Sequence, residues 1–470
     1  MNPFDAASPL DSRYYLADGE FFRRLHPFVS EAAQVKYLAR VEAALAETLA
    51  AHGVCPAAVA AEIGQACQAV TAEEVYEEER RIQHNIRALV NCIRRKLGPA
   101  ARPYVHLFAT SADIMDTARA LCLKEVTGAV ILPDLSKLLR TLIGMAREHA
   151  GTPQMGRTHG QHAVPITFGF AVALYVSRLG QRLQVIDQAS RNLRGKFAGA
   201  VGACNALSLL RPDNPASLEA DLMARLGLKT PEISSQVVQP EYVTDYVYAL
   251  ASCWGVMANL ADDFRHLQRS EIRELRDRKA LDPNSAVVGS STMPHKVNPK
   301  DFENVKSLWK AYMPRIVTVL MDQVSEHQRD LTNSASSRFV TEFVTAFAYG
   351  IYRLQGSVDG IEPDMARMRE VLESGKDPVT AEPLYVLLSL AGHGDAHEQA
   401  RVSARQAKAA NITLAQLIRS DGTIQQYLQR LSPEQRAILE DPAKYQGAAE
   451  QITRAVCDEW EKRLSSNPGS

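Results

Sequence analysis

The chain has 470 residues, of which 46% are hydrophobic and 23% are charged, a balance typical of a water-soluble globular protein. This length exceeds what one simple core accommodates, so we expect two or three domains. The formal net charge of −1 gives no electrostatic reason to expect binding to nucleic acid or to an anionic membrane surface.

The cellular setting is predicted from the cysteines and from the apolar runs. Seven cysteines are scattered along the chain without a CxxC pair, which favours reduced thiols. The first residues lack a signal-peptide pattern, and no apolar run approaches the ~20 residues that span a bilayer. We therefore expect a cytoplasmic protein with no membrane partner.

Helical periodicity dominates the chain from the N-terminus onward. Before Thr110 the pattern predicts amphipathic segments over 31–52 and 71–96, and the second opens with Thr71 and Glu74 at capping-box spacing. Few segments alternate as strands do. The N-terminal region is therefore expected to consist of helices of moderate length.

The middle of the chain predicts three long helices. Between Pro240 and Pro283, apolar residues recur at intervals of three and four. They are Tyr242, Tyr246, Leu250, Cys253, Met257, Leu260, Phe264, Leu267 and Leu275. Segments 168–196 and 301–328 are candidate neighbours, the latter with a bend at Pro314. Helices this long imply an elongated bundle whose remaining apolar surface is covered by other helices or other subunits.

After Asp359 the pattern changes to short helices, broken by "GHGDAH" and "SDGT". We therefore predict an all-α protein of three domains: an N-terminal helical domain (1–109), a central long-helix bundle (110–360) and a C-terminal helical domain (361–470).

The stretch "GSSTMPHKVNP", residues 289–299, concentrates polar side chains between a glycine and a proline. Glycine and two prolines exclude a regular helix, so we expect a mobile loop. A solvated turn before the next helix is the simplest interpretation, but two hydroxyls with a Lys-x-Asn arrangement favour chemistry. Lys296 beside Asn298 suits a carboxylate, and Ser290 suits removal of a proton from carbon. A nucleophilic serine is less supported, because no GxSxG surrounds it.

The stretch "GRTHGQHAVPITFG", residues 156–169, contains two histidines. His159 and His162 could bind a metal ion together with His295, but neither an HExxH motif nor a Cys/His ligand set accompanies them. One of the two is alternatively a structural histidine, and the other a general acid, since imidazole changes charge near neutral pH.

Hydroxyl and arginine residues gather in further stretches. They are Arg13 and Tyr14 in "SPLDSRYY", Thr110 and Ser111 in "FATSADIMDTA", and Arg329, Ser334 and Arg338 in "QRDLTNSASSR". Any one of them alone is an N-cap or a surface ion pair, but together they suit a phosphate. No P-loop or GxGxxG pattern indicates a nucleotide cofactor, so the phosphate is expected on the substrate.

These stretches, with "GKFAGAVG", resemble in content and order the fumarase/aspartase superfamily, and within it the adenylosuccinate lyase family. The similarity covers nearly the whole chain. It implies a mostly helical, three-domain subunit, a homotetramer with a twenty-helix core, and active sites assembled from three subunits. The implied reaction is a cofactor-free β-elimination that releases fumarate from adenylosuccinate, giving AMP, and from the succinocarboxamide (SAICAR) intermediate of purine synthesis.

The resemblance also implies roles for individual residues. Ser290 is the general base, His159 the general acid, and Glu303 orients His159; Lys296 and Asn298 bind the carboxylate that becomes an aci-carboxylate. Arg13, Tyr14, Arg329, Ser334 and Arg338 are expected to hold the phosphate. His84, Thr110, Ser111 and Gln236 are expected to line the succinyl and purine pocket. The loop at 289–299 is then a lid over the substrate.

One residue departs from the family pattern. Asn85 follows His84 where the family usually has aspartate, which removes a negative charge near the substrate pocket. This leaves two alternatives: a superfamily relative that acts on another succinyl-amine or on carboxymuconate, and a structural protein that reuses the lyase fold, as lens crystallins do. The presence of Ser290, His159 and Lys296 together argues against the structural protein.

Overall fold

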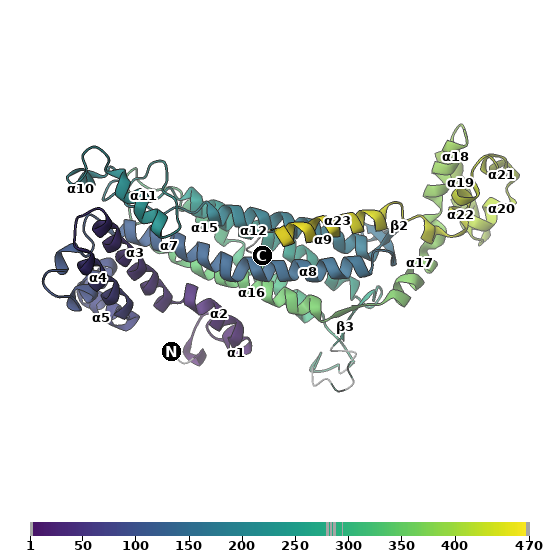
Figure 1. Ribbon diagram of the computed structural model, residues 1–470. Helices are drawn as coiled ribbons and strands as arrows, with labels where there is room; N and C mark the ends of the chain where they lie inside the picture. Colours follow the sequence, from purple (N-terminus) through teal and green to yellow (C-terminus); the bar gives the residue numbers. More distant parts are fainter. Residues whose placement is uncertain (1–2, 279–281, 283, 285–287, 294, 467–470) are drawn as a thin grey trace.

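The computed structural model describes residues 3–278, 282, 284, 288–293 and 295–466. It is an elongated helical molecule whose longest helices run side by side along its long axis (Figure 1). The helices of this bundle are α7 (Ser111–Val126), α8 (Leu132–Glu148), α9 (Phe168–Arg191), α12 (Glu241–Leu267), α14 (Lys300–Tyr312), α15 (Arg315–Met321), α16 (Phe339–Asp359) and α23 (Ala449–Ser466). The predicted all-α class is therefore confirmed.

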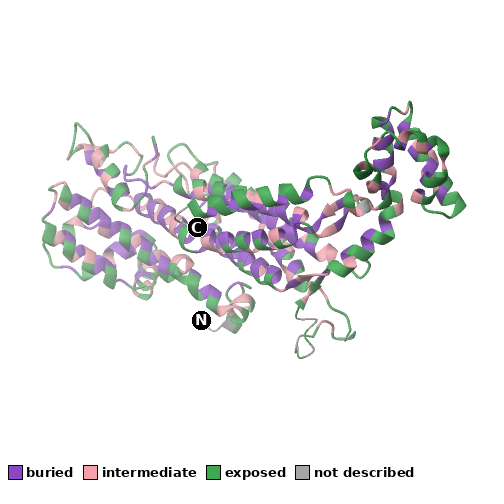
Figure 2. Ribbon diagram, turned by 45° about the vertical axis from the view of Figure 1, so that its right-hand side comes forward, coloured by how far each residue is buried: buried purple, intermediate pink, exposed green. Residues whose placement is uncertain are grey.

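The helix α12 forms the centre of the bundle. Tyr246 and Trp254 are fully buried, and the indole of Trp254 packs against the rings of Phe343 and Phe347 from α16. Buried residues follow the central helices while exposed residues cover the outer faces (Figure 2). The predicted apolar face is thus present as far as Leu267.

Two predicted helix ends require correction. The helix α12 ends at Leu267, and Leu275 lies instead in the strand β3 (Leu275–Asp277), which pairs with β4 (Ile361–Pro363). The connector expected near Pro283 lies outside the described residues. The helix expected over 301–328 is divided into α14 and α15 at Pro314, as its proline suggested, and α15 already ends at Met321.

The helices α7 and α8 form one continuous rod through a π-helical turn, Thr127–Ile131. The turn lies just before Pro133, which has no N–H to donate to the helix. Inside the turn, the hydroxyl of Thr127 contacts the Leu123 carbonyl and the Tyr246 hydroxyl, each at 2.6 Å. This long rod was not among the helices predicted from the sequence.

The N-terminal region contains α1 (Arg13–Ala17), α2 (Gly19–Val29), α3 (Glu31–Ala51), α4 (Ala57–Ala69), α5 (Ala72–Ile82) and α6 (Asn85–Arg95). The capping box of Thr71 and Glu74 is present at the start of α5. The single segment expected over 71–96 is wrong, because Gln83 adopts a left-handed conformation (φ 59°) and His84 begins a second helix.

A hairpin and two short helices lie beside the bundle, and the hairpin carries His159 and His162. A hairpin of β1 (Pro153–Thr158) and β2 (Gln161–Thr167), which the sequence did not predict, lies between α8 and α9. The short helices α10 (Asn205–Ser208) and α11 (Ala216–Arg225) precede α12. Four 3₁₀ turns complete the described structure: Pro3–Asp5, Arg102–Tyr104, Ser336–Arg338 and Pro442–Lys444.

The C-terminal region divides into two parts. The helices α17 (Met365–Val379), α18 (Ala381–Leu390), α19 (Ala396–Ala410), α20 (Leu414–Ser420), α21 (Gly422–Leu428) and α22 (Pro433–Glu440) extend from one end of the bundle, and α18–α22 enclose a small apolar core (Figure 1). The helix α23 returns to the bundle, where Trp460 packs against Gly180 of α9. Ala109 and Gly360 both lie between elements, and the division into three domains at these points stays a prediction.

In the part of the chain that the structure describes, no helix has both the length and the apolar character needed to cross a membrane.

Candidate active site

The polar stretch 289–299 lies between β3 and α14 and is neither helix nor strand in its described residues, which leave out Pro294. The side-chain amide of Asn298 donates to the carbonyl oxygen of Gly289 at 2.7 Å and joins the two ends of the stretch. A Cβ atom on Gly289 would lie 2.2 Å from the carbonyl oxygen of Lys296, so only glycine fits this neck. We call this segment the signature loop. An amide has two N–H donors, so Asn298 keeps one for a ligand.

Ser290 has two backbone N–H groups directed at its hydroxyl oxygen. The N–H of Thr292 lies 3.3 Å and that of Met293 lies 3.1 Å from the Ser290 Oγ atom. Hydrogen bonds donated to an oxygen favour its negatively charged form. This turn is therefore suited to a serine that gives up its own proton and then accepts one from carbon. Lys296, on the same loop, is exposed and can reach an anionic ligand.

His159 occupies the tip of the β1–β2 hairpin. It forms a two-residue turn with Gly160, and both residues have positive φ, 53° and 73°. Positive φ is uncommon for a residue with a side chain, and it presents the exposed His159 ring outward from the bundle. Outward presentation is what a proton donor to a ligand requires.

The hairpin is anchored beneath this tip to the segment that leads into the signature loop. Glu274 is fully buried and accepts hydrogen bonds from Gln154 at 2.7 Å and from Arg157 at 2.5 Å. It directly precedes β3. The hairpin that carries His159 and the strand that leads toward the loop therefore share one buried carboxylate, which the sequence did not single out.

His162 has a different environment from His159. Its ring lies against Gly375 of α17, where a Cβ atom would come within 2.6 Å of the His162 Nδ1 atom. This contact fits the structural role left open for one of the two histidines. Within the described residues, no group of three His, Cys, Asp or Glu side chains is arranged to hold a metal ion. The absence of a metal requirement stays a prediction.

Glu303 lies in the first turn of α14 and is exposed. Its carboxylate forms an ion pair with Arg265, whose Nη1 atom lies 4.0 Å from the Glu303 Oε1 atom. No hydrogen bond or ion pair joins Glu303 to His159 among the residues described for this single chain. The orienting role expected of Glu303 stays a prediction.

Thr110 and Ser111 are held by a buried ion pair at the start of α7. Asp113 accepts from the Thr110 N–H at 2.8 Å and pairs with Lys196, and both charged side chains are almost completely buried. The same carboxylate accepts from the N–H groups of Ala198 and Gly199 at 3.1 and 3.2 Å. This network fixes the helix start against the "GKFAGAVG" segment. The three-residue spacing of Thr110 and Asp113 is typical of a capping box and could have been found in the sequence. The burial of Lys196 could not, because its partner Asp113 is distant in the sequence.

His84 and Asn85 lie at the start of α6, close to α7. The Nδ1 atom of His84 accepts from the N–H of Arg87 at 3.2 Å, which caps the start of the helix. The amide of Asn85 donates to the sulfur of Met115 on α7 at 3.4 Å. Met115 is one turn beyond Ser111, so the structure brings Asn85 beside the predicted substrate pocket.

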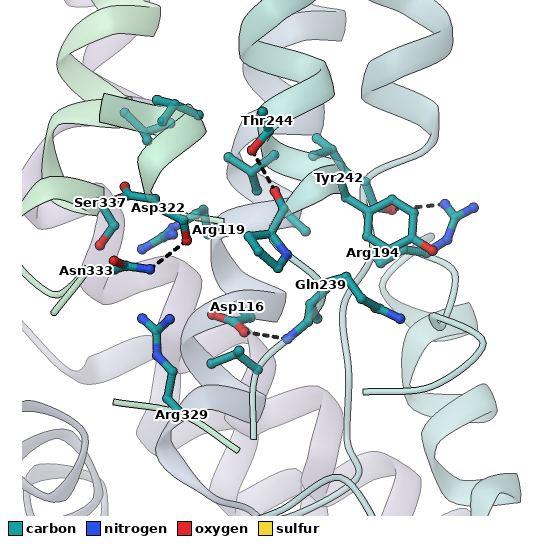
Figure 3. A pocket seen from close by; sticks show the side chains of 18 residues that line it. Asp116, Arg119, Arg194, Gln239, Tyr242, Thr244, Asp322, Arg329, Asn333 and Ser337 are labelled. Carbon is teal, nitrogen blue, oxygen red and sulfur yellow. Dashed lines mark hydrogen bonds between the residues drawn. The ribbon is translucent and has the colours of Figure 1, made fainter. Parts of the chain in front are cut away.

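A pocket that is open to solvent lies between α7, α12 and α15 (Figure 3). Its polar lining includes Asp116, Arg119, Asp322, Arg329 and Asn333. Burial raises the pKa of Asp116 above its ordinary value, while the charge of Arg119 and the N–H of Val238, at 2.9 Å, oppose this shift. The pocket places the predicted Arg329 within reach of α7.

Gln236 lies next to the same pocket. Its N–H donates to the carbonyl of Gln328 at 3.3 Å, which places the segment before α12 beside Arg329. Ser334 and Arg338 follow in the same connection and are exposed. The single chain therefore brings Thr110, Ser111, Asn85, Gln236 and Arg329 to one end of the bundle.

Arg13 and Tyr14 lie apart from both the signature loop and the pocket beside α7, on the side of α16. The ring of Tyr14 lies 4.9 Å from that of Tyr349, and Arg13 is exposed. The helix α16 begins directly after Arg338, so the N-terminal arginine and the arginine at 338 share one supporting helix.

The predicted site residues are thus spread along the bundle in one chain. The continuous rod from Ser111 to Glu148 spans roughly 55 Å at 1.5 Å per residue, and the hairpin with His159 follows its far end. Thr110 and Ser111 are consequently far from the His159 of the same chain.

Comparison with known proteins identifies the family. A family model described as "Lyase" matches residues 24–310, and one described as "Adenylosuccinate lyase C-terminal" matches residues 325–436. The chain is 33% identical to the adenylosuccinate lyase of Pyrococcus horikoshii, over 97% of this chain and 99% of that protein. It is 32% identical to the adenylosuccinate lyase of Methanothermobacter thermautotrophicus, over 90% and 93% of the two chains.

Solved structures share the fold. The 3-carboxy-cis,cis-muconate lactonizing enzyme from Pseudomonas putida superposes with a TM-score of 0.82 and 26% identity, covering 96% of this chain and all of that one. A fumarate lyase from Mesorhizobium sp. BNC1, at 24% identity and a TM-score of 0.80, covers 93% of this chain and 97% of that one and supports the fold alone. Together with the family models and the near full-length relatives, these matches show that the chain belongs to the adenylosuccinate lyase family of the fumarase/aspartase superfamily.

Proposed function

We propose that this protein is an adenylosuccinate lyase, which releases fumarate from adenylosuccinate and from the related succinocarboxamide nucleotide. The observation that carries the proposal is the signature loop, in which Ser290 has two N–H donors on its hydroxyl oxygen and Lys296 is free to meet an anion. The near full-length relatives named adenylosuccinate lyase support this substrate over carboxymuconate.

The proposed reaction breaks one C–H and one C–N bond. The Ser290 oxygen, deprotonated and stabilised by its two N–H donors, takes the proton from the succinyl Cβ atom. Lys296 and the remaining amide hydrogen of Asn298 stabilise the negative charge that develops on the adjacent carboxylate. The C–N bond then breaks as His159 protonates the departing nitrogen, and fumarate leaves.

We further propose a homotetramer in which each site combines groups from three chains. Two observations support assembly. The first is the distance along the rod between Thr110 and Ser111 at one end and His159 of the same chain at the other, and the second is a set of apolar side chains exposed on and after α15. These are Val317, Leu320, Met321, Val324 and Leu331, between 47% and 79% exposed. A second chain would cover them and could bring its His159 to Glu303. Cytoplasmic location stays a prediction.

The phosphate of the substrate is assigned to Arg13, Tyr14, Arg329, Ser334 and Arg338, and the succinyl and purine groups to His84, Asn85, Thr110, Ser111 and Gln236. Arg329 is supported by its place in the pocket beside α7. Arg13 and Arg338 are supported by their exposure and by their places near α16, which begins directly after Arg338 and carries the Tyr349 ring that contacts Tyr14.

The test is incubation of the purified protein with adenylosuccinate while AMP and fumarate are measured. The protein should first be treated with EDTA and dialysed, and activity is expected to survive. Carboxymuconate, offered in parallel, is expected to remain unconverted. Conversion of carboxymuconate alone would favour the superfamily alternative, and no conversion of any substrate would favour the structural protein. If activity is lost with EDTA and restored by a divalent ion, the hypothesis that His159 and His162 bind a metal ion would be favoured.

A further inference from the structure

Arg353, on α16, contacts two carboxylates that come from distant parts of the chain. Its Nη2 atom lies 2.7 Å from the Oδ1 atom of Asp301, and its Nη1 atom lies 3.6 Å from the Oδ2 atom of Asp18. The three side chains are 17% to 34% exposed, so water screens these contacts only in part. One guanidinium thus stands between two acidic groups.

Asp301 belongs to the base of the signature loop. It lies in the first turn of α14, two residues after Pro299, the last residue of the loop. The neighbouring backbone is ordered by hydrogen bonds from the Lys300 N–H to the Asn298 carbonyl at 2.8 Å and from the Glu303 N–H to the Pro299 carbonyl at 3.2 Å. A shift of Asp301 would therefore move the point from which the loop departs.

Asp18 belongs to the segment that carries Arg13 and Tyr14. Its N–H donates to the Tyr14 carbonyl at 2.9 Å, and its carboxylate accepts from the Tyr349 hydroxyl at 2.6 Å. The Tyr349 ring in turn lies against the Tyr14 ring. Figure 1 shows α1 and α2 beneath α16. Asp18 consequently ties α1 to the same helix that carries Arg353.

We propose that Arg353 is a positioning residue that couples the Arg13–Tyr14 segment to the base of the signature loop. Its fork of donors allows one side chain to hold two carboxylates at once, which a lysine point charge does less well. Its Nε atom is buried without a hydrogen-bond partner among the described residues, so the arrangement carries a cost to stability.

The inference rests on the proposed function, since it assumes that Arg13 and Tyr14 receive the substrate phosphate. Binding energy from a remote, non-reacting group can be used at the reacting centre only if the two are mechanically connected. Arg353 supplies such a connection. Phosphate binding should therefore assist the chemical step in the native protein and assist it less when Arg353 is replaced.

The test compares adenylosuccinate with succinyladenosine, which lacks the phosphate, in the wild type, Arg353→Met and Arg353→Lys. The quantity compared is kcat/KM for adenylosuccinate divided by kcat/KM for succinyladenosine. We expect this ratio to fall about fivefold or more in Arg353→Met, and to fall less in Arg353→Lys. The matched control is Arg147→Met. Arg147 also bridges two carboxylates, Asp458 at 2.7 Å and Glu461 at 2.9 Å, but between α8 and α23. An unchanged ratio in Arg353→Met would overturn the proposal.

Two single-link variants keep the proposal testable if Arg353→Met does not fold. Asp18→Asn and Asp301→Asn each remove one carboxylate charge, and each should lower the same ratio. Amide hydrogen exchange gives a readout without activity: Asp18→Asn should speed exchange at Lys300 and Glu303, although neither contacts Asp18. If the wild type cleaves no substrate but this exchange effect is present, the proposed lyase function is wrong, while the coupling of Asp18 to the base of the signature loop through Arg353 is right. Unchanged exchange would reject the coupling itself.

Discussion

The signature loop and the start of α7 both carry predicted site residues, but they are built in opposite ways. The loop is joined at its neck by one amide, Asn298, and its Lys296 is exposed. The start of α7 is held by the buried Asp113–Lys196 pair and by three backbone N–H groups on the same carboxylate. The loop leaves Lys296 exposed, whereas the start of α7 cannot move without disturbing a buried charge pair.

This difference indicates a division of labour. A group that transfers protons must reach the reacting atom, whereas a group that receives a substrate is most effective when it is already in place. We therefore expect replacements in the loop to act on kcat, and replacements around α7 to act on stability or on binding.

The largest effect is expected from the proton-transfer residues. Ser290→Ala and His159→Ala should each lower kcat by about 10²–10⁴-fold or more while the substrate still binds, because both act in proton transfer. Steady-state kinetics with a separate binding measurement provide the check. Ser291→Ala and His162→Ala are the neighbouring controls and should keep most activity. Near-normal turnover in Ser290→Ala would remove the loop from the chemistry.

Mixing the two inactive proteins tests whether the loop and the hairpin of different chains meet. After subunit exchange, Ser290→Ala and His159→Ala together should regain activity, since random assembly leaves about one site in four with both groups intact. Each protein exchanged with itself is the control. A protein that light scattering shows to be both active and monomeric would contradict the shared site.

Asp113→Asn tests the rigid region. Loss of the carboxylate leaves the Lys196 ammonium buried without its partner, a change that typically costs about 3–5 kcal/mol in free energy of unfolding. Chemical and thermal unfolding measure this loss. Glu459→Gln, which breaks an exposed pair with Arg463, should cost at most about 0.5 kcal/mol. Equal losses in the two variants would mean that α7 is not anchored as described.

Asn85→Asp adds a negative charge beside α7, where an anionic substrate is expected. We predict a change in KM and in the preference between adenylosuccinate and the succinocarboxamide nucleotide, with less change in kcat. Repulsion of about 1 kcal/mol would raise KM roughly fivefold. The measurement is kcat and KM for both substrates in the wild type and in Asn85→Asp. A collapse of kcat at constant KM would place Asn85 in the chemical step.

The smallest effect concerns acid stability near His84. Hydrogen bonds from Arg81, Asn91 and Arg95 lower the pKa of Glu78 to about 2, below its ordinary value of 4.5. Between these two values the unfolded chain binds more protons than the folded one, so the contribution of Glu78 to stability is lost as the pH falls. Acid unfolding should therefore depend less steeply on pH in Glu78→Gln within this window. An identical pH dependence would show that Glu78 adds nothing there.

Local patterns in the sequence were sufficient for much of the fold. The three- and four-residue periodicity of α3, α9 and α12, the capping box at Thr71 and the break at Pro314 depend on neighbours within one or two turns. The polar stretch at 289–299 and the ordered motifs were visible for the same reason: their residues are close in sequence. The family and the chemistry it carries followed from them.

Other features depend on partners that are distant in the sequence. The break at Gln83 has neither glycine nor proline to mark it, and the β1–β2 hairpin is anchored by Glu274, more than a hundred residues later. The sequence around these residues did not indicate that Lys196 forms a buried ion pair with Asp113. Nor did it indicate that Arg353 forms ion pairs with both Asp18 and Asp301. Charge pairs of this kind form only after the helices have packed, because packing is what brings the charges within reach and removes water from them. Local sequence patterns therefore predict the long helices α9 and α12 and nominate the candidate reactive residues, and tertiary packing decides which side chains are held in place.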